Sequence, residues 1–524
     1  MLKYFCAILF TGAVTTRAAA QPITDTLYTV TVDLHKTAQT IDNFGASGCW
    51  FSEGIGKYWP TEKKERIAEL LFSKKLDKNG QPIGIGLSAW RFNIGAGTSE
   101  QGDSSGIKDF RKRTECFLNP DGSYDWTKQA GYRFFLQKAH DYGVEDLIAF
   151  TNSPPVQFTK NGLGFKTEKD FKSNLKENSY DAYARFLAEV LKHFDQTGLH
   201  FNYISPVNEP QWDWSHADKK ADQEGSAWQN EEIYHVVKSL NNILDGAQLK
   251  SKILVTEAGM LTYLYSGQSK TSHQVQDFFS PASSFYLGGF GHVPKLIGGH
   301  SYFTESNDST LMATRTRLAD TVKKYNVNFW QTEYSMLANG YKEGTTGKRS
   351  AMDCALFLAK IIHTDLSTAN ATAWQFWNSY EPGSAEFDTR YYLIALKPAA
   401  PDFKDGEFTI TKNLWALGSY SRFVRPGMNR VITEVSDNHH RDNKNIMVTA
   451  YTGKKNELVM VAINYSTKNT AVKLDIKNAG KKYHTIARYL TAAGADLNMK
   501  PLPVLPAGSQ IILPARSILT VIVN

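Results

Sequence analysis

Ile204-Ser205-Pro206-Val207-Asn208-Glu209-Pro210 is a short β-rich run that ends at a proline and leaves a glutamate at its end. The same shape recurs at Val327-Asn328-Phe329-Trp330-Gln331-Thr332-Glu333-Tyr334. Other apolar runs also end in polar or aromatic residues and a Gly, Pro or Asn turn, with helix-like segments between them. In a (β/α)8 barrel the carboxyl ends of the strands face one mouth, where the active site lies. The pattern predicts an α/β fold, a (β/α)8 TIM barrel over residues 39–425.

Alternation of short strands with longer helices supports the same fold. Strands are expected at roughly 40–46, 87–94, 146–151, 201–205, 253–256, 296–301, 327–332 and 373–377. Helices are expected at 61–72, 126–142, 179–194, 229–244, 309–325 and 349–364. In 179–194 the apolar residues recur at steps of three and four, which is one face of a helix.

The two ends of the chain differ from this pattern. Residues 1–20 place Lys3 before an apolar run and end in Ala18-Ala19-Ala20, the layout of a signal peptide. The apolar run is too short to span a bilayer, so we expect a secreted or periplasmic protein, cleaved near Ala20, without a transmembrane segment. Residues 426–524 alternate as an antiparallel β-sandwich would, and the strand-like segment 21–38 is expected to join it.

Charge and cysteines exclude several classes of partner. The formal net charge of +7 falls to +5 when residues 1–20, with Lys3 and Arg17, are removed, and this excess is too mild to indicate nucleic acid. The remaining cysteines are three, so at most one disulfide can form, and no zinc-binding spacing occurs. A cysteine-based metal site is therefore not expected. The chemistry predicted below requires no metal or cofactor, and we expect a monomer.

The two strand-end glutamates predict glycosidic bond cleavage. This chemistry needs one carboxylic acid to protonate the leaving oxygen and one carboxylate to attack, on either side of the sugar. Glu209 is the candidate acid/base and Glu333 the candidate nucleophile, because the fourth and seventh strands of a barrel lie across the mouth from one another. A separation of about 5–5.5 Å would give retention of configuration, and about 6.5–9.5 Å inversion.

Several other residues near strand ends are candidates for the site. Arg91 could hold Glu333 ionised, although an internal ion pair of the barrel is an equal alternative. Tryptophans could stack on sugar faces, with core packing as their alternative, and these are Trp50, Trp212, Trp214, Trp374 and Trp377. Glu257 is a candidate hydroxyl binder. The candidate binding residues, besides one asparagine introduced below, are Arg91, Trp50, Trp212, Trp214, Glu257, His300, Tyr302, Tyr334 and Trp374.

Five motifs resemble glycoside hydrolase family 30, within the clan of retaining barrel glycosidases, and together cover most of the mature chain. They are Gln39-Thr40-Ile41-Asp42-Asn43-Phe44-Gly45-Ala46-Ser47-Gly48, Trp90-Arg91-Phe92-Asn93-Ile94-Gly95, Ser153-Pro154-Pro155, Val207-Asn208-Glu209-Pro210 and Trp330-Gln331-Thr332-Glu333, and segment 414–427 is also similar. The resemblance implies an acid/base at Glu209, a nucleophile at Glu333, a side β-sandwich and a bond from Asn208 to the sugar 2-hydroxyl. The stretch 153–158 departs from relatives, which often place tryptophan and methionine there.

Within the family the segments look most like the endo-β-1,6-galactanase branch, which implies a polysaccharide substrate such as the side chains of type II arabinogalactan. β-1,6-Glucanase, xylanase and glucosylceramidase-type activities are alternatives in the same family. A barrel that binds glycan without cutting it is an alternative of a different class. The presence of both Glu209 and Glu333 disfavours a non-catalytic barrel, because a binding protein does not need two opposed carboxylates.

Overall fold

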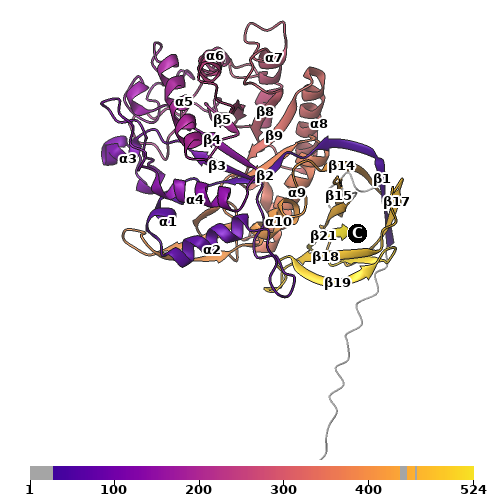
Figure 1. Cartoon of the computed structure of the whole chain (residues 1–524). Helices are drawn as coiled ribbons and strands as arrows, with labels where there is room; N and C mark the ends of the chain where they lie inside the picture. The colour runs from indigo at the N-terminus through magenta and orange to yellow at the C-terminus, as the bar shows by residue number, and fades with distance from the viewer. Residues whose placement is uncertain (1–26, 437–444, 455–456) are drawn as a thin grey trace, which may run out of the picture.

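The computed structural model describes residues 27–436, 445–454 and 457–524, and it has two parts, a parallel barrel and a curled β-sheet (Figure 1). The predicted signal peptide at 1–20, and the beginning of the segment 21–38, lie outside the described residues.

The barrel is a closed ring of parallel strands. Its strands pair in the order β6-β5-β4-β3-β2-β10-β9-β8-β7, and β6 and β7 are two pieces of the fifth strand, separated by Leu254. The Leu254 N–H donates to the Ile204 carbonyl at 2.9 Å, so the fifth strand continues the ladder with β5. The predicted TIM barrel is therefore confirmed. Its strands are β2 (Asn43–Ser47), β3 (Ala89–Asn93), β4 (Asp146–Phe150), β5 (Tyr203–Ser205), β6 (Lys252–Ile253), β7 (Val255–Ala258), β8 (Leu296–His300), β9 (Asn328–Glu333) and β10 (Ala373–Phe376).

Amphipathic helices cover the outside of the barrel. In α5 the apolar residues that recur at steps of three and four are buried against the core, because one helical face meets the sheet. The helices are α1 (Ser52–Tyr58), α2 (Thr61–Phe72), α3 (Thr98–Gln101), α4 (Ala130–Asp141), α5 (Tyr180–Gln196), α6 (Asn230–Gly246), α7 (Gln274–Phe279), α8 (Asp308–Tyr325), α9 (Ala351–Ser367) and α10 (Lys412–Ser421).

The curled sheet encloses its own apolar core and packs against α9 and α10 (Figure 1). The Thr520 hydroxyl donates to the Ser419 carbonyl of α10 at 3.0 Å, which joins the two parts. The strands pair in the order β19-β18-β21-β16-β15-β14-β1-β17-β20. They are β1 (Leu27–Thr40), β14 (Asn429–Val435), β15 (Ile446–Thr452), β16 (Leu458–Asn464), β17 (Thr470–Lys477), β18 (Thr485–Thr491), β19 (Lys500–Pro506), β20 (Ile511–Leu513) and β21 (Ser517–Val523).

One pair in this sheet differs from the antiparallel expectation. β1 runs antiparallel to β14, where Val30 faces Val435, but parallel to β17, where Val30 faces Leu474. A tight turn imposes antiparallel pairing only on strands that it connects. β1 enters from the other end of the chain, so no turn constrains its direction.

A small three-stranded sheet, which the sequence pattern did not indicate, follows the eighth barrel strand. It consists of β11 (Tyr380–Pro382), β12 (Ile394–Pro398) and β13 (Gly406–Ile410), and it stands beside the barrel mouth. Lys63 of α2 ties it down through ion pairs to Asp405 at 3.0 Å and Glu407 at 2.8 Å.

Two further features bear on the expectations. Among the described residues, no helix has the length and apolarity needed to cross a bilayer. Cys49, Cys116 and Cys354 are all free and buried, so the fold relies on its apolar core rather than on a disulfide between them.

Candidate active site

A pocket of about 340 Å³ opens at the barrel mouth between loops that follow five of the strands. It contains both glutamates that the sequence pattern singled out. Its lining consists of Asn152, Asn208, Glu209, Trp212, Trp214, Gln223, Tyr302, Phe303, Glu333, Leu337 and Trp377.

The two carboxylates reach this pocket from different strands. Glu333 is the last residue of β9, and Glu209 follows β5 with a left-handed backbone, φ 45°. A left-handed conformation is costly for a residue with a side chain, and two hydrogen bonds support it here. The Glu209 N–H donates to the Glu257 carbonyl at 2.8 Å, and the Trp214 indole donates to the Glu209 carbonyl at 3.1 Å. The side chain of Glu209 is thereby held toward Glu333.

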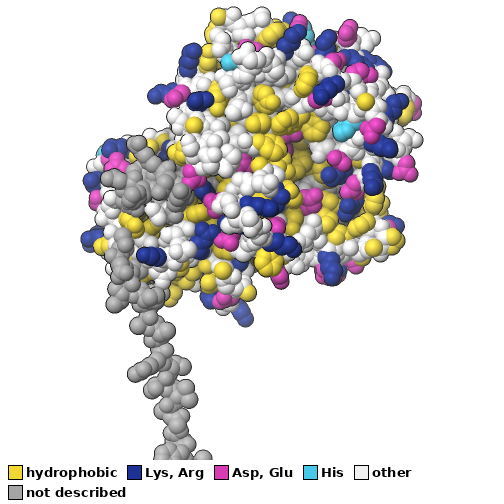
Figure 2. Space-filling model, turned by 180° about the vertical axis from the view of Figure 1, so that it is seen from behind, with side chains coloured by type: hydrophobic (Ala, Val, Ile, Leu, Met, Phe, Trp, Pro, Cys, Tyr) yellow, Lys and Arg dark blue, Asp and Glu magenta, His cyan; other side chains and the backbone are white. Residues whose placement is uncertain are grey.

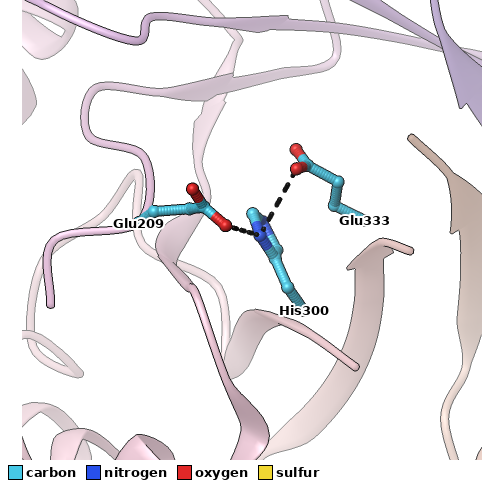
Figure 3. Close-up of side chains that lie close together, drawn as sticks. All are labelled: Glu209, His300 and Glu333. Atoms are coloured by element: carbon cyan, nitrogen blue, oxygen red, sulfur yellow. Dashed lines mark hydrogen bonds and ion pairs between the residues drawn. The ribbon is translucent and has the colours of Figure 1, made fainter. Parts of the chain in front are cut away.

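His300, the last residue of β8, lies between the two glutamates (Figure 3). Its Nδ1 is 3.1 Å from Glu209 Oε1 and 3.6 Å from Glu333 Oε1, and its Nε2 is 3.2 Å from Glu257 Oε2. Burial opposes the charged imidazolium, but the three carboxylates outweigh it and raise the pKa of His300 to about 9. The ring is therefore cationic at neutral pH.

Glu257 and Arg91 form a buried ion pair beneath the pocket, with Arg91 Nη2 3.5 Å from Glu257 Oε2. Ser205 donates to Glu257 Oε1 at 2.6 Å, and Thr332 donates to Oε2. Burial raises the pKa of Glu257, but Arg91, His300 and these donors prevail and lower it to about 2. The structure therefore places Glu257 among protein partners as a fixed anion, away from the pocket lining.

Glu333 receives two direct hydrogen bonds. Arg91 Nη1 donates to its Oε2 at 2.8 Å, and the Tyr302 hydroxyl donates to its Oε1 at 3.0 Å. Burial raises the pKa of Glu333, and the charges of His300 and Arg91 act against that rise. The predicted contact of Arg91 with Glu333 is present. Arg91 also forms an ion pair with Glu257 inside the barrel, so both expected roles occur together.

The charges of the cluster nearly balance. Arg91 and protonated His300 carry two positive charges, and Glu209, Glu257 and Glu333 carry up to three negative ones. One further proton would make the cluster neutral, so the charges of the site are compatible with one carboxylic acid beside carboxylates. The arrangement can therefore present one carboxylic acid and one carboxylate to the same ligand.

Asn208 lies beside Glu209 in the pocket, and its side-chain oxygen has no hydrogen-bond partner. Its Nδ2 donates to Asn152 Oδ1 at 3.1 Å, whereas its Oδ1 is buried without a hydrogen-bond partner. A buried acceptor of this kind costs free energy until a ligand satisfies it. Asn208 is thus suited to accept a hydrogen bond from a ligand hydroxyl.

The predicted aromatic residues divide into two groups. Trp212, Trp214 and Tyr302 line the pocket, whereas Trp50 lines a second pocket described below. Trp374 and Tyr334 are fully buried, and their polar atoms are satisfied inside the protein: the Trp374 indole donates to Asp365 and the Tyr334 hydroxyl donates to Glu305 at 3.3 Å. These two pack the barrel below the mouth.

Four lining residues were not among the residues that the sequence singled out: Asn152, Gln223, Phe303 and Leu337. Asn152 lies two residues after β4, and the end of a strand is the signal that selected the others. Trp377, a tryptophan that the sequence singled out, directly follows β10 and lines the pocket. Phe303 and Leu337 are 44% and 39% exposed, and nothing in their spacing marks them, because their exposure depends on loop paths.

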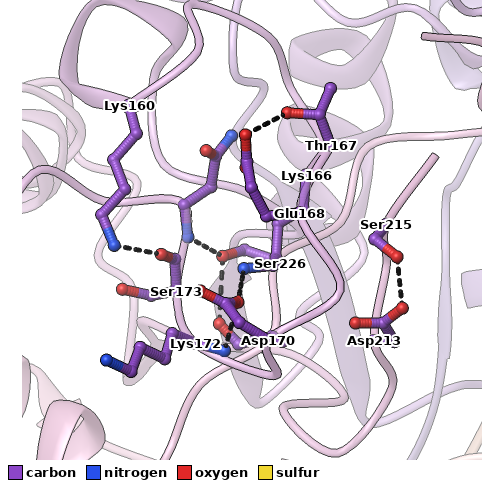
Figure 4. A network of polar contacts seen from close by, with 12 residues as sticks. Lys160, Lys166, Thr167, Glu168, Asp170, Lys172, Ser173, Asp213, Ser215 and Ser226 are labelled. Atoms are coloured by element: carbon purple, nitrogen blue, oxygen red, sulfur yellow. Dashed lines mark hydrogen bonds and ion pairs between the residues drawn. The ribbon is translucent and has the colours of Figure 1, made fainter. Parts of the chain in front are cut away.

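The loop that carries Trp212 and Trp214 is fixed by a polar network with the loop after β4 (Figure 4). The Lys166 N–H donates to the Trp214 carbonyl at 3.1 Å, and the Asn174 N–H donates to Ser226 Oγ at 3.1 Å. Lys160 Nζ donates to the Ser173 carbonyl at 3.0 Å within the neighbouring loop. The tryptophans are therefore positioned before any ligand arrives.

Glu209, His300 and Glu333 also have the donor types of a metal site, since one ligand atom from each lies within 4.8 Å of the others. A metal needs the neutral imidazole, and the pKa of His300 is raised to about 9. The Arg91 guanidinium already compensates Glu333 at 2.8 Å. The geometry therefore favours paired carboxyl groups that act without an ion.

Comparisons with known proteins agree on one family. A family model described as O-Glycosyl hydrolase family 30 matches residues 27–388. Endo-beta-1,6-galactanase of Hypocrea rufa is 22% identical over 489 residues, 89% of this chain and 88% of its own. Glucuronoxylanase XynC of Bacillus subtilis (strain 168) is 24% identical over 353 residues, 67% of this chain and 68% of its own. A conserved exported protein from Bacteroides fragilis, a solved structure, has a TM-score of 0.87 at 35% identity and covers 94% of this chain and 100% of its own.

Proposed function

The chain belongs to O-glycosyl hydrolase family 30, and from this premise we propose that it cleaves a β-linked polysaccharide by double displacement, with Glu333 as nucleophile and Glu209 as acid/base. It is a glycoside hydrolase that acts on β-glycans. One observation supports the assignment of the two residues most directly. A carboxylate oxygen of Glu209 and one of Glu333 lie within 4.8 Å of one another in a single pocket. This proximity fits the separation of about 5–5.5 Å that retaining enzymes use.

In the first step Glu333 attacks the anomeric carbon while Glu209 gives its proton to the glycosidic oxygen. The bond from the anomeric carbon to the leaving oxygen breaks as the bond to the Glu333 carboxylate forms. Two donors, Arg91 and Tyr302, contact Glu333 and orient its carboxylate for attack. The free Oδ1 of Asn208 accepts a hydrogen bond from a hydroxyl of the same sugar.

In the second step water replaces Glu333 on the anomeric carbon. Glu209, now a carboxylate, takes a proton from the water as the oxygen of that water bonds to carbon. His300 supports this step, because its Nδ1 lies 3.1 Å from Glu209 Oε1 and stabilises the ionised form. Two displacements return the original configuration.

We propose β-1,6-galactan as the substrate, cleaved within the chain. The galactanase of Hypocrea rufa supports this choice, because its similarity extends over 89% of the chain, against 67% for the glucuronoxylanase. β-1,6-Glucan, xylan and glucosylceramide are the competing substrates within the family. The aromatic lining, with Trp212, Trp214 and Trp377, suits sugar faces in general and does not select among them.

The test is hydrolysis of a panel of four substrates: β-1,6-galactan, β-1,6-glucan, xylan and glucosylceramide. We expect oligosaccharide products from galactan, with a β-anomeric first product by proton NMR, and none from a Glu333→Gln control. Preferred cleavage of another member would overturn the galactan proposal. An α-anomeric first product would overturn double displacement, and binding of glycan without any cleavage would overturn the proposed hydrolysis.

We also propose that the chain is exported and cleaved near Ala20. Its support is the arrangement of Lys3, the apolar run and three alanines, together with the match to an exported protein. Amino-terminal sequencing of the protein from the culture medium or the periplasm tests this. A mature form that begins at Met1 would overturn it.

A further inference from the structure

A second pocket, of about 520 Å³, opens at the same barrel mouth beside the first. It lies between α1, the loop that precedes Cys116, and the turn between β12 and β13, which are the loops of the first, second and eighth strands. Figure 2 shows hydrophobic side chains gathered in a hollow of the barrel part, with acidic side chains among them. Such an apolar, concave surface is typical of a ligand site.

Four side chains of this pocket, Phe51, Phe110, Arg111 and Phe403, form one surface of planar groups that are tilted against one another. The Arg111 guanidinium lies 5.1 Å from the ring centroid of Phe51 and 4.7 Å from that of Phe403. The Phe403 ring lies 5.8 Å from that of Phe110, which is 50% exposed. Flat apolar faces of this kind match the axial C–H groups of a sugar ring.

This surface is held in place without a ligand. Asp109 accepts two hydrogen bonds from Arg111, each at 2.8 Å, and fixes the plane of the guanidinium. The Trp59 indole donates to the Phe403 carbonyl at 3.1 Å and anchors the turn that carries Phe403. A ligand that binds here therefore meets a preorganised surface and orders little of the protein.

The cationic groups of the pocket are already paired. Arg111 pairs with Asp109, Arg113 with Asp103 at 2.7 Å, and Lys57 lies near Glu53 and Glu115 at 3.5 and 3.8 Å. An acidic sugar would have to displace these carboxylates. The chemistry therefore favours a neutral sugar.

Two tryptophans connect the pockets. Trp50 lines the second pocket and Trp377 lines the first, and their rings meet edge to face with centroids 5.9 Å apart. The leaving group must contact Glu209, which follows β5, whereas the second pocket lies on the loops of β2, β3 and β10. Sugars on the other side of the cleaved bond thus extend past Trp377 toward Trp50.

We propose that the second pocket binds neutral sugar units of the substrate on the side of the cleaved bond away from Glu209, and so sets the length of chain that the enzyme prefers. The proposal rests on the proposed function, because its occupant is the same glycan that Glu209 and Glu333 cleave. Phe110, Arg111 and Phe403 would then determine which length of substrate the enzyme prefers.

The test compares kcat/KM for β-1,6-galacto-oligosaccharides from disaccharide to hexasaccharide. For the wild type we expect kcat/KM to rise with length until the second pocket is filled. Phe110→Ala and Arg111→Gln should reduce the ratio of kcat/KM between hexasaccharide and disaccharide by about tenfold, equivalent to the loss of one stacking contact. Phe387→Ala is the matched control, because Phe387 is 45% exposed and lines neither pocket.

Two results would overturn the proposal while hydrolysis itself remains established: the same length ratio in both variants and the wild type, or an equal loss in Phe387→Ala. A third result would also overturn it: an alkyl glycoside whose kcat/KM falls in the two variants as much as that of the hexasaccharide. The occupant of the second pocket would then be an apolar chain. Failure of the wild type to cleave an oligosaccharide of any length would instead contradict the proposed function, and this inference with it.

Discussion

Replacement of His300 by asparagine tests whether the charge of this ring holds the carboxylate cluster together. Asparagine keeps a donor near the Nδ1 position but carries no charge. In the wild type three carboxylates overcome the opposing effect of burial and raise the pKa of His300 from 6.5 to about 9. The protonated ring therefore contributes stability that the variant lacks.

The size of this contribution follows from the shift. One pKa unit corresponds to about 1.36 kcal/mol, so the shift from 6.5 to about 9 corresponds to about 3 kcal/mol of unfolding free energy. Because the folded pKa is the higher one, the contribution is complete below pH 6.5 and is lost as the pH rises through about 9. The advantage of the wild type over His300→Asn should shrink by about 3 kcal/mol between about pH 6 and about pH 10.

Urea unfolding followed by tryptophan fluorescence at a series of pH values measures this difference. His292→Asn is the matched control, because His292 is also buried but its Nδ1 lies 2.9 Å from the Ser251 carbonyl rather than from a carboxylate. A constant difference between wild type and His300→Asn across the pH range would refute the charge argument. So would an equal pH dependence of the difference in the control.

Five further substitutions test other parts of the site. Glu333→Gln should abolish turnover, whereas Glu209→Ala should keep part of it on aryl glycosides whose leaving group needs no proton; wild-type rates in both would refute the two roles. Asn208→Ala should lower kcat/KM by about tenfold or more, through loss of the acceptor Oδ1, and an unchanged value would exclude a bond to substrate. Tyr302→Phe should lower kcat about tenfold more than it changes KM, because its hydroxyl donates to the nucleophile at 3.0 Å; an effect on KM alone would argue for a purely binding role. Glu257→Gln should reduce the unfolding free energy by about 3–5 kcal/mol in urea denaturation, since it leaves a buried cation underpaired, and a loss near zero would contradict that.

The barrel could be predicted because its signals are local. The residues of α5 recur with the helical period, and each barrel strand is a short apolar run whose end is marked by polar residues. Both signals lie within a few residues of sequence. Glu209 and Glu333 were found for the same reason, since each ends such a run.

The direction of side chains at strand ends could not be read from the sequence. Trp374 lies within β10 and is buried against Tyr334, whereas Trp377, three residues later, lines the pocket. Which side chain points to the mouth depends on strand tilt and on where the pleat ends, and both are set by closure of the whole barrel. The ion pair of Glu257 with Arg91 likewise requires β7 and β3, which are distant in sequence, to come together in the closed barrel.

The place of β1 between β14 and β17 has a consequence for how the chain is made. Val30 pairs with Val435, which is 405 residues downstream. At about 5–20 residues per second, roughly 20–80 s of synthesis separate the two valines. During that interval an apolar strand waits without either neighbour, so a chaperone that shields segment 27–40 would protect the nascent protein more than one that acts on its finished barrel.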